Sequence, residues 1–202
     1  SIRKTLTAQG ADIHTPYGAT EALPVAVISG REIVEETASR SEAGHGTCVG
    51  TLFPEVDVRI TEIHEGPIEQ FNDLRLLPDG EIGEIVVRGL SVTKSYFRLD
   101  DATAAAKVRD GNSTWHRMGD VGYFDDTGRL WFCGRKAHRV ETENGTLYSV
   151  PCEAIFNQHP DVRRSALVGI GNRPHQKPAI VIECEPSVTP APELLEELQQ
   201  TA

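Results

Sequence analysis

The sequence predicts an α/β protein in which a β-rich body precedes a smaller α+β unit. From Thr47 to Arg135, short runs of alternating apolar and polar residues are separated by turn signals, a pattern typical of half-buried strands. After Gly134, two short helical patterns enclose two apolar runs, which indicates strands packed by helices. We therefore expect a β-rich body in residues 1–134 and a smaller, incomplete α+β unit in residues 135–202.

Residues 47–134 are expected to form a barrel-like subdomain or curved sheet. The run "VDVRITEI" (56–63) alternates as a strand does, and a Pro-Asp-Gly turn precedes a second strand around Ile85 to Val87. The stretch "GYFDDTGRLWFCG" predicts a hairpin around an Asp-Asp-Thr-Gly turn. Between them, "LDDATAAAKVRDG" predicts one helix, capped by Asp100 or Asp101 and closed near Gly111.

The elements expected after Gly134 are short. "VETENGTLYSV" predicts a hairpin with Asn144-Gly145 in a type I′ turn, and Pro151 opens a short helix. The runs "SALVGIG" and "PAIVIECE" predict two strands. A C-terminal helix follows in "SVTPAPELLEELQQ", with Leu194, Leu195 and Leu198 expected on one side.

Composition excludes several classes of protein. The chain has 202 residues, of which 39% are hydrophobic and 25% charged, as in a soluble globular protein. Its formal net charge of −10 argues against nucleic-acid binding, which needs a basic face. It contains neither a run of 18 apolar residues nor a signal peptide, so we expect no transmembrane segment and a cytoplasmic location.

The cysteines and histidines are dispersed. Four cysteines form no C-x-x-C pair, and no histidine has zinc-ligand spacing with a cysteine. We expect free, structural cysteines and no metal held by His or Cys.

The stretch "HTPYGATEALPV" (14–25) is the least explicable as ordinary packing. The Tyr17 ring could stack on a base, and Gly18 would let the backbone approach a ligand closely. The Thr20 hydroxyl could bond a phosphate oxygen, and the Glu21 carboxylate is a suitable ligand for Mg²⁺. The alternative is a surface turn with a buried tyrosine.

A second stretch, "WHRMGDVGYFDDTGRLWFCGR" (115–135), carries two candidate ligand contacts. Asp120 could accept both hydroxyls of a ribose, and Arg135 could fork onto a ribose or phosphate oxygen. Taken alone, each residue is more typical of a turn cap or a salt-bridged surface group. The intervening "GEIGEIVVRGLSVTKSYF" (80–97) shows no nucleophile or base, and we expect it to be scaffold.

Taken in order, these three stretches resemble the adenylate-forming superfamily of acyl-CoA ligases, peptide-synthetase adenylation domains and luciferases. Its members carry Y-G-x-T-E, a Gly-Glu-rich strand motif and R-T-G-D…G-R at similar separations. The resemblance implies that Tyr17 faces adenine, with Gly18 beside the nucleotide. It also implies that Thr20 meets the α-phosphate, Glu21 the Mg²⁺, and Asp120 and Arg135 the ribose. Catalysis would then involve Thr20 and Glu21.

The family activates a carboxylic acid with ATP as an acyl-adenylate, and often passes the acyl group to coenzyme A. Its phosphate loop would precede Ser1 and its lid lysine would follow Ala202, so we expect this chain to be a piece with little activity alone. The family's hinge position holds Ala137 instead of Asp or Lys, and a usual lysine position holds Glu141. Those departures leave the use of CoA open.

The sequences "HTPYGATEALPV" and "GRKAHRVET" together most resemble the β-lactone synthetase branch of the family, whose members act in bacterial olefin biosynthesis. That branch implies a 2-alkyl-3-hydroxy fatty acid as substrate, closed to a β-lactone without CoA, and leaves room for contacts with other enzymes of the pathway. The alternatives are a long-chain fatty acyl-CoA or acyl-AMP ligase, and an inactive nucleotide-binding or interaction fragment.

Overall fold

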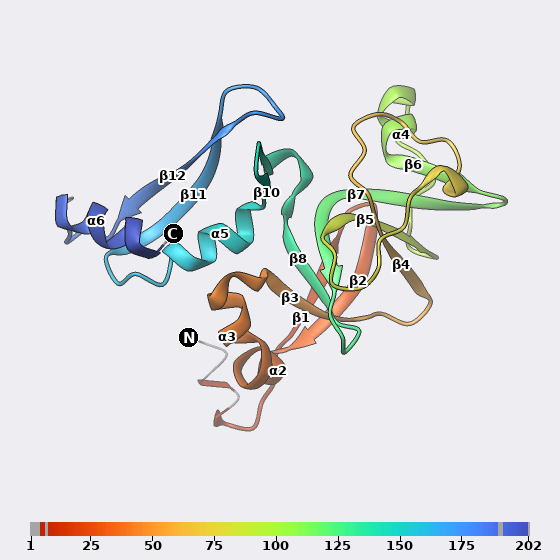
Figure 1. Ribbon diagram of the computed structural model, residues 1–202. Coiled ribbons are helices and arrows are strands. Elements are labelled where there is room, and N and C mark those ends of the chain that lie inside the picture. Colours follow the sequence, from red (N-terminus) through yellow and green to blue (C-terminus); the bar gives the residue numbers. More distant parts are fainter. Residues whose placement is uncertain (1–4, 7, 190–191, 202) are drawn as a thin grey trace. The chain divides into compact units, whose positions relative to one another are not determined.

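The computed structural model describes residues 5–6, 8–189 and 192–201 (Figure 1). The chain divides into two compact units. The first combines Ser1–Ala38 with Cys48–Phe132, and the second combines Ser39–Thr47 with Cys133–Ala202. The domain boundary expected at Gly134–Arg135 stays a prediction.

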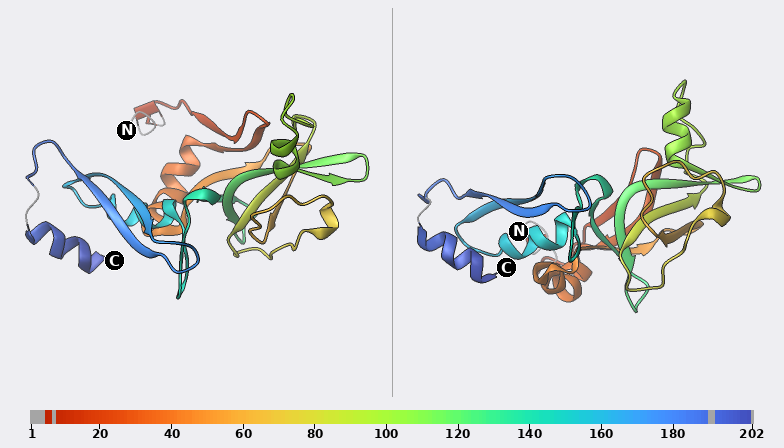
Figure 2. Two further views of the ribbon diagram at one scale, coloured as in Figure 1. Left: turned by 90° about the horizontal axis from the view of Figure 1, so that it is seen from above. Right: turned by 45° about the horizontal axis from the view of Figure 1, so that its top comes forward.

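A large antiparallel sheet dominates the first unit and confirms the predicted α/β class. Its strand order is β1-β2-β3-β8-β7-β5-β4, with β6 pairing on β7. Figures 1 and 2 show the β6–β7 hairpin extending beyond the rest of the sheet. The strands are β1 (His14–Ala19), β2 (Ala22–Ser29), β3 (Thr47–Leu52), β4 (Val56–Thr61), β5 (Gly83–Gly89), β6 (Lys107–Asp110), β7 (Ser113–Phe124) and β8 (Leu130–Arg135).

Central strand β5 explains where the core of this unit lies. Ile85, Val86 and Val87 are fully buried in succession, because β5 is covered on both faces. Ile85 and Val87 belong to one apolar cluster, whereas Val86 packs with Val108 and Trp115 in a second. The Phe71 ring stacks on Trp115 with centroids 4.6 Å apart.

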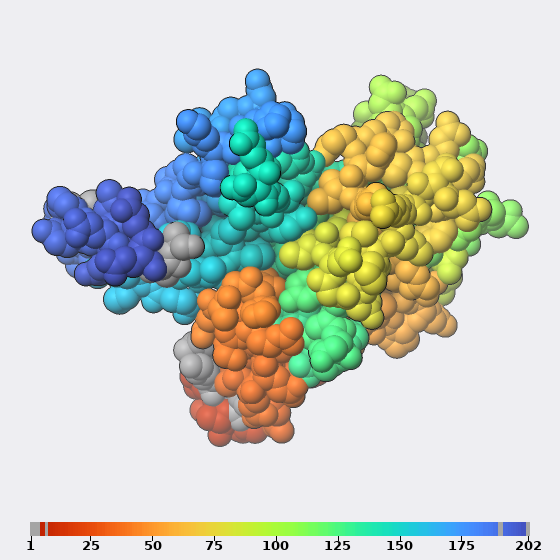
Figure 3. Space-filling model, viewed as in Figure 1, coloured from red at the N-terminus to blue at the C-terminus, as the bar shows by residue number. Residues whose placement is uncertain are grey.

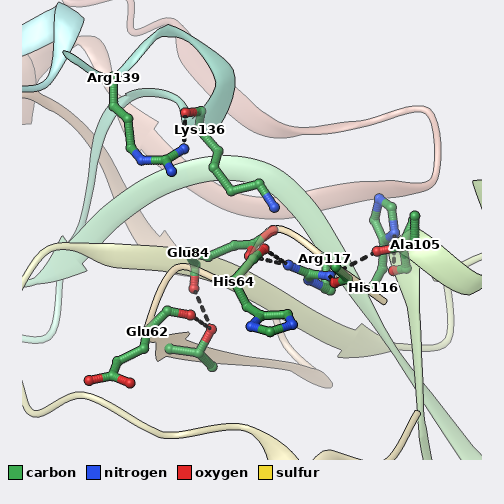
Figure 4. A network of polar contacts seen from close by, with 11 residues as sticks. Glu62, His64, Glu84, Ala105, His116, Arg117, Lys136 and Arg139 are labelled. Atoms are coloured by element: carbon green, nitrogen blue, oxygen red, sulfur yellow. Dashed lines mark hydrogen bonds and ion pairs between the residues drawn. The ribbon is translucent and has the colours of Figure 1, made fainter. Parts of the chain in front are cut away.

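A buried ion pair joins β5 to β7 and anchors an irregular segment. Glu84 and Arg117 meet at 2.7 Å, with side chains 2% and 3% exposed (Figure 4). The Arg117 guanidinium also donates to the carbonyls of His64, Gly66 and Ala105. The segment that it holds, around the 3₁₀ turn η3 (Phe71–Asp73), lies at the surface of the unit (Figure 3).

The predicted helix after Leu99 is shorter than expected. Helix α4 spans Asp100–Ala106, and no side chain caps its N-terminus, so the expected cap by Asp100 or Asp101 is wrong. The residues expected to complete it form β6, because Lys107–Asp110 pair with β7. Gly111 lies at the turn of that hairpin rather than at a helix end.

A helical segment after β2 was not predicted. Ser29 and Glu32 form a capping box at the start of α2 (Gly30–Glu32). The helical path continues through η1 (Ile33–Thr37), α3 (Ala38–Arg40) and η2 (Ser41–His45). Its residues are mostly polar, so no apolar stripe of helical period marks it in the sequence.

The second unit contains the predicted hairpins and helices. Strands β9 (Val140–Thr142) and β10 (Gly145–Leu147) pair antiparallel, as do β11 (Val162–Ile170) and β12 (Lys177–Cys184). The unit also contains helices α5 (Ser149–Phe156) and α6 (Pro192–Thr201) and the 3₁₀ turn η4 (Lys136–His138). In α6, Leu198 is buried but Leu195 is 59% exposed, so the three leucines do not share one packed side.

The β9–β10 turn differs from the prediction. Thr142 pairs with Gly145, so the two connecting residues are Glu143 and Asn144. Neither has a positive φ, which a type I′ turn requires at both positions. The expected type I′ turn at Asn144-Gly145 is therefore wrong.

One guanidinium fixes the segment that follows β8. Arg173 donates to the carbonyl oxygens of Ala137 and Arg139, at 2.6 and 2.9 Å. The main-chain N–H of Gln176 donates to the Glu141 carbonyl oxygen, and the main-chain N–H of Glu141 donates to Gln176 Oε1. Residues 137–141 are therefore held against the loop between β11 and β12.

All four cysteines are free thiols, as expected. Burial raises the pKa of Cys133 to about 12, so this thiol stays protonated and acts as a small apolar side chain. No helix within the described residues is long and apolar enough to cross a membrane.

Candidate functional site

Thr20 and Glu21 form the tip of a β-hairpin. Strands β1 and β2 pair antiparallel, and Ala19 faces Ala22, so Thr20 and Glu21 are the two connecting residues. Thr20 is exposed and Glu21 half-buried. The hairpin therefore presents a hydroxyl and a carboxylate side by side at the end of a strand pair.

Gly18 lies where the hairpin has no room for a side chain. A Cβ at this position would come within 2.5 Å of the Ala22 carbonyl oxygen and 2.8 Å of Leu23 Cδ1. The β1–β2 register also shifts between Tyr17 and Ala19. Packing alone accounts for glycine here, and its predicted role beside a nucleotide stays a prediction.

Tyr17 and Asp120 are brought together, although 103 positions separate them in the sequence. The Tyr17 hydroxyl donates to Asp120 Oδ2 at 2.7 Å. Asp120, on β7, is 5% exposed, whereas Tyr17 is half-buried, with its ring centroid 6.0 Å from that of Phe132. The phenol of Tyr17 and the carboxylate of Asp120 thus form a hydrogen-bonded pair.

Arg135 ends β8 and its side chain is exposed. It belongs to the second unit. Its predicted contact with a ribose stays a prediction.

The surroundings of Glu21 include residues that sequence reasoning had assigned to scaffold or left unremarked. The Tyr96 hydroxyl donates to Glu21 Oε1 at 2.7 Å, and the Thr93 amide donates to the Glu21 carbonyl at 2.8 Å. The Lys107 ammonium donates to Thr93 Oγ1 at 3.0 Å. Thr93 and Tyr96, in the stretch 80–97 that is expected to be scaffold, therefore contact Glu21, and only the folded contact between distant segments reveals it.

Burial and mutual contacts shift the pKa values of the titratable side chains around Glu21. The hydrogen bond from Tyr96 is the main cause that lowers the pKa of Glu21, so the carboxylate is ionised at neutral pH. Burial and the same bond raise the pKa of Tyr96 to about 12. Burial lowers the pKa of Lys107, and burial together with the Lys107 charge lowers that of His116 to about 4. His116 is thus neutral near pH 7.

The oxygen atoms at the tip of the hairpin fit a magnesium ion whose remaining ligands come from a substrate and water. No group of three or more His, Cys, Asp or Glu side chains suited to a metal occurs within the described part of the chain. Mg²⁺ is commonly bound through one or two carboxylates, with phosphates and water completing its octahedron. Glu21 supplies one such carboxylate, whose Oε1 accepts a hydrogen bond from the Tyr96 hydroxyl.

Comparison with known proteins places this geometry in context. Residues 2–97 match the model of the AMP-binding enzyme family. The chain is 52% identical to an olefin β-lactone synthetase of Xanthomonas campestris over 93% of its length, and 49% identical to one of Stenotrophomonas maltophilia over its whole length. It spans 34% and 37% of these relatives. A 2-succinylbenzoate–CoA ligase of Geobacillus kaustophilus is 37% identical over 61% of the chain.

Solved structures share the fold. An amide bond synthetase from Marinactinospora thermotolerans superposes with a TM-score of 0.71 at 28% identity, over 93% of this chain and 35% of its own. An O-succinylbenzoate coenzyme A synthetase from Bacillus subtilis, solved with ATP and a magnesium ion, gives a TM-score of 0.74 at 21% identity, over 100% of this chain and 37% of its own. The fold expected from the three motifs is confirmed.

Proposed function

Because the chain belongs to the AMP-binding, adenylate-forming enzyme family, we propose that the full-length protein containing it activates a fatty acid with ATP and Mg²⁺. The substrate in this proposal is a 2-alkyl-3-hydroxy fatty acid that closes to a β-lactone. The observation that carries it is the 52% identity to an olefin β-lactone synthetase over 93% of the chain.

The proposed reaction has two steps. A carboxylate oxygen of the acid attacks the α-phosphorus of ATP, and the bond to the bridging oxygen breaks, releasing pyrophosphate. The 3-hydroxyl oxygen of the same acid then attacks the acyl carbon, and the carbon–oxygen bond to AMP breaks. The products are a β-lactone, AMP and pyrophosphate, and no thiol takes part.

The chain's own residues would supply positioning and electrostatics. In this proposal Tyr17 stacks on adenine, Asp120 accepts the ribose hydroxyls with Arg135, and Thr20 donates to the α-phosphate. Glu21 would hold Mg²⁺, whose charge offsets that of the phosphates during displacement. The 2.7 Å hydrogen bond between Tyr17 and Asp120 supports this assignment, since it sets an aromatic ring beside a carboxylate, as a bound nucleoside would require.

The segment after β8 supports a reaction without CoA. Glu141, at a position where the resemblance leads one to expect lysine, pairs with the buried Arg139. The Ala137 side chain carries no charge with which to form the pairs available to Asp or Lys. We infer that this segment is adapted to a protein that does not need the thioester-forming step.

The test uses the full-length protein with ATP, Mg²⁺ and a 2-alkyl-3-hydroxy fatty acid, with and without CoA. Products are identified by mass spectrometry and NMR. We expect a β-lactone and AMP in equal amounts, formed equally well without CoA. A thioester that forms only with CoA would identify an acyl-CoA ligase instead. Absence of any AMP release would favour a nucleotide-binding protein without this activity.

A further inference from the structure

We propose that Tyr96 is a positioning residue for the metal site, because its hydroxyl holds one oxygen of Glu21 and leaves the other to Mg²⁺. The inference rests on the proposed function, in which Glu21 is the metal ligand. The two residues lie 75 positions apart, and their oxygen atoms are 2.7 Å apart. Such a distance is typical of a hydroxyl donating to an ionised carboxylate.

A carboxylate held in this way favours a single geometry at the metal. Oε1 of Glu21 already accepts a hydrogen bond from the Tyr96 hydroxyl, so Oε2 is the oxygen better placed to bind a cation. Mg²⁺ requires near-ideal octahedral angles, and one fixed carboxylate oxygen suits it better than a rotating group. Residues that hydrogen-bond a ligating carboxylate set its orientation and strengthen metal binding.

Tyr96 is itself fixed at its main chain and at its ring. Its amide donates to Thr103 Oγ1 at 3.0 Å, and that hydroxyl in turn donates to the Leu99 carbonyl. The Lys107 ammonium lies 5.6 Å from the centroid of the Tyr96 ring, within range of a cation–π contact. The phenol therefore meets Glu21 in one orientation.

The same lysine steadies the main chain of the hairpin tip. Lys107 is 7% exposed and bonds Thr93 Oγ1, while the Thr93 amide bonds the Glu21 carbonyl. Both the carboxylate and the backbone of Glu21 are thus tied to the loop that follows β5. A buried lysine in this position supports the ligand rather than reaching a substrate.

The test measures metal binding directly in the full-length protein. Free Mn²⁺, which is visible by electron paramagnetic resonance, is titrated in the presence of α,β-methylene-ATP. The variants are Tyr96→Phe, Glu21→Gln and the matched control Tyr123→Phe, which removes a tyrosine hydroxyl on β7 outside the site. We expect Tyr96→Phe to weaken Mn²⁺ binding 10- to 100-fold, as roughly found for such supporting residues, and Tyr123→Phe to leave it unchanged.

A second readout separates the metal effect from general damage. Nucleotide binding without metal, measured by calorimetry, is expected to be the same in Tyr96→Phe and the unaltered protein. Thr103→Val, which removes the anchor of the Tyr96 amide, is expected to weaken Mn²⁺ binding in the same direction.

The outcomes distinguish this inference from the function on which it rests. If Mn²⁺ binding falls in Glu21→Gln but stays within about twofold in Tyr96→Phe, Tyr96 has no positioning role and the proposed function stands. Unchanged binding in Glu21→Gln would remove Glu21 as the ligand, and this inference with it. Loss of metal-free nucleotide binding in Tyr96→Phe would also contradict it.

Discussion

The protonation of the buried His116 side chain affects the stability of the protein. His116 is 3% exposed, and its Nδ1 lies 3.3 Å from the Ala106 carbonyl oxygen, which the neutral tautomer with Nδ1–H can satisfy. Its pKa falls from 6.5 to about 4 because of burial and the neighbouring Lys107 charge. Between these pH values the unfolded chain binds a proton that the folded chain does not.

We therefore expect stability to fall as pH is lowered from about 6.5 to 4, by at most about 3 kcal/mol from His116. In His116→Gln, which keeps an N–H donor but does not titrate, this part of the slope should be absent. Urea unfolding at several pH values measures how the free energy of unfolding of each protein depends on pH. The same slope in both proteins would show that another group is responsible.

Asp125 titrates in a separate range. Burial raises its pKa, but hydrogen bonds from Thr127, Trp131 and the Arg129 amide outweigh burial and lower the pKa to about 2. Its stabilising contribution is therefore lost only as pH falls from about 3.8 towards 2. The two effects do not overlap.

Pairing between β5 and β7 depends on the Glu84–Arg117 ion pair. Removing one partner of a buried pair leaves the other charge without compensation, which costs about 3–5 kcal/mol. We expect Glu84→Ala to lower the free energy of unfolding by about this amount, as measured in urea. A loss below about 1 kcal/mol would contradict the prediction.

The double variant Glu84→Met/Arg117→Met serves as the control for that prediction. It removes both charges but also leaves the carbonyls of His64, Gly66 and Ala105 without their donor. We therefore expect it to recover stability only in part relative to Glu84→Ala.

Elements with strong local signals were predictable from the sequence, and those decided by distant pairing were not. The alternation of apolar and polar residues in β4 and the turn residues between β7 and β8 are local signals. The structure confirms strand β4 and the β7–β8 hairpin that they predict. Lys107–Asp110 continue a helical pattern, yet pairing with β7 makes them a strand. The candidate site shows the same difference between local and distant signals. Thr20 and Glu21 can be recognised in the local sequence "YGATE", whereas the role of Tyr96 depends on a contact with Glu21, 75 positions away.

The two units differ in how their strands are covered. In the first, Ile85, Val86 and Val87 of β5 are fully buried in succession. In the second, Val168, Ile170 and Val181 on the β11–β12 pair are 42–62% exposed. Local stability follows the density of buried contacts, so the second unit should open more readily.

Hydrogen exchange followed by mass spectrometry tests this difference. We expect amides of residues 162–184 to exchange at least about tenfold faster than those of residues 83–89 and 115–123, which lie in the central strands. Equal protection of both sets would show that the two units unfold as one.

The guanidinium of Arg173 joins two stretches of main chain in the second unit. It holds the carbonyls of both Ala137 and Arg139, and Gln176 adds two main-chain hydrogen bonds to Glu141. Residues 137–141 and the loop between β11 and β12 therefore form one connected piece. A displacement of this loop would carry residues 137–141 with it, so a change in the loop sequence would also alter the segment that follows β8.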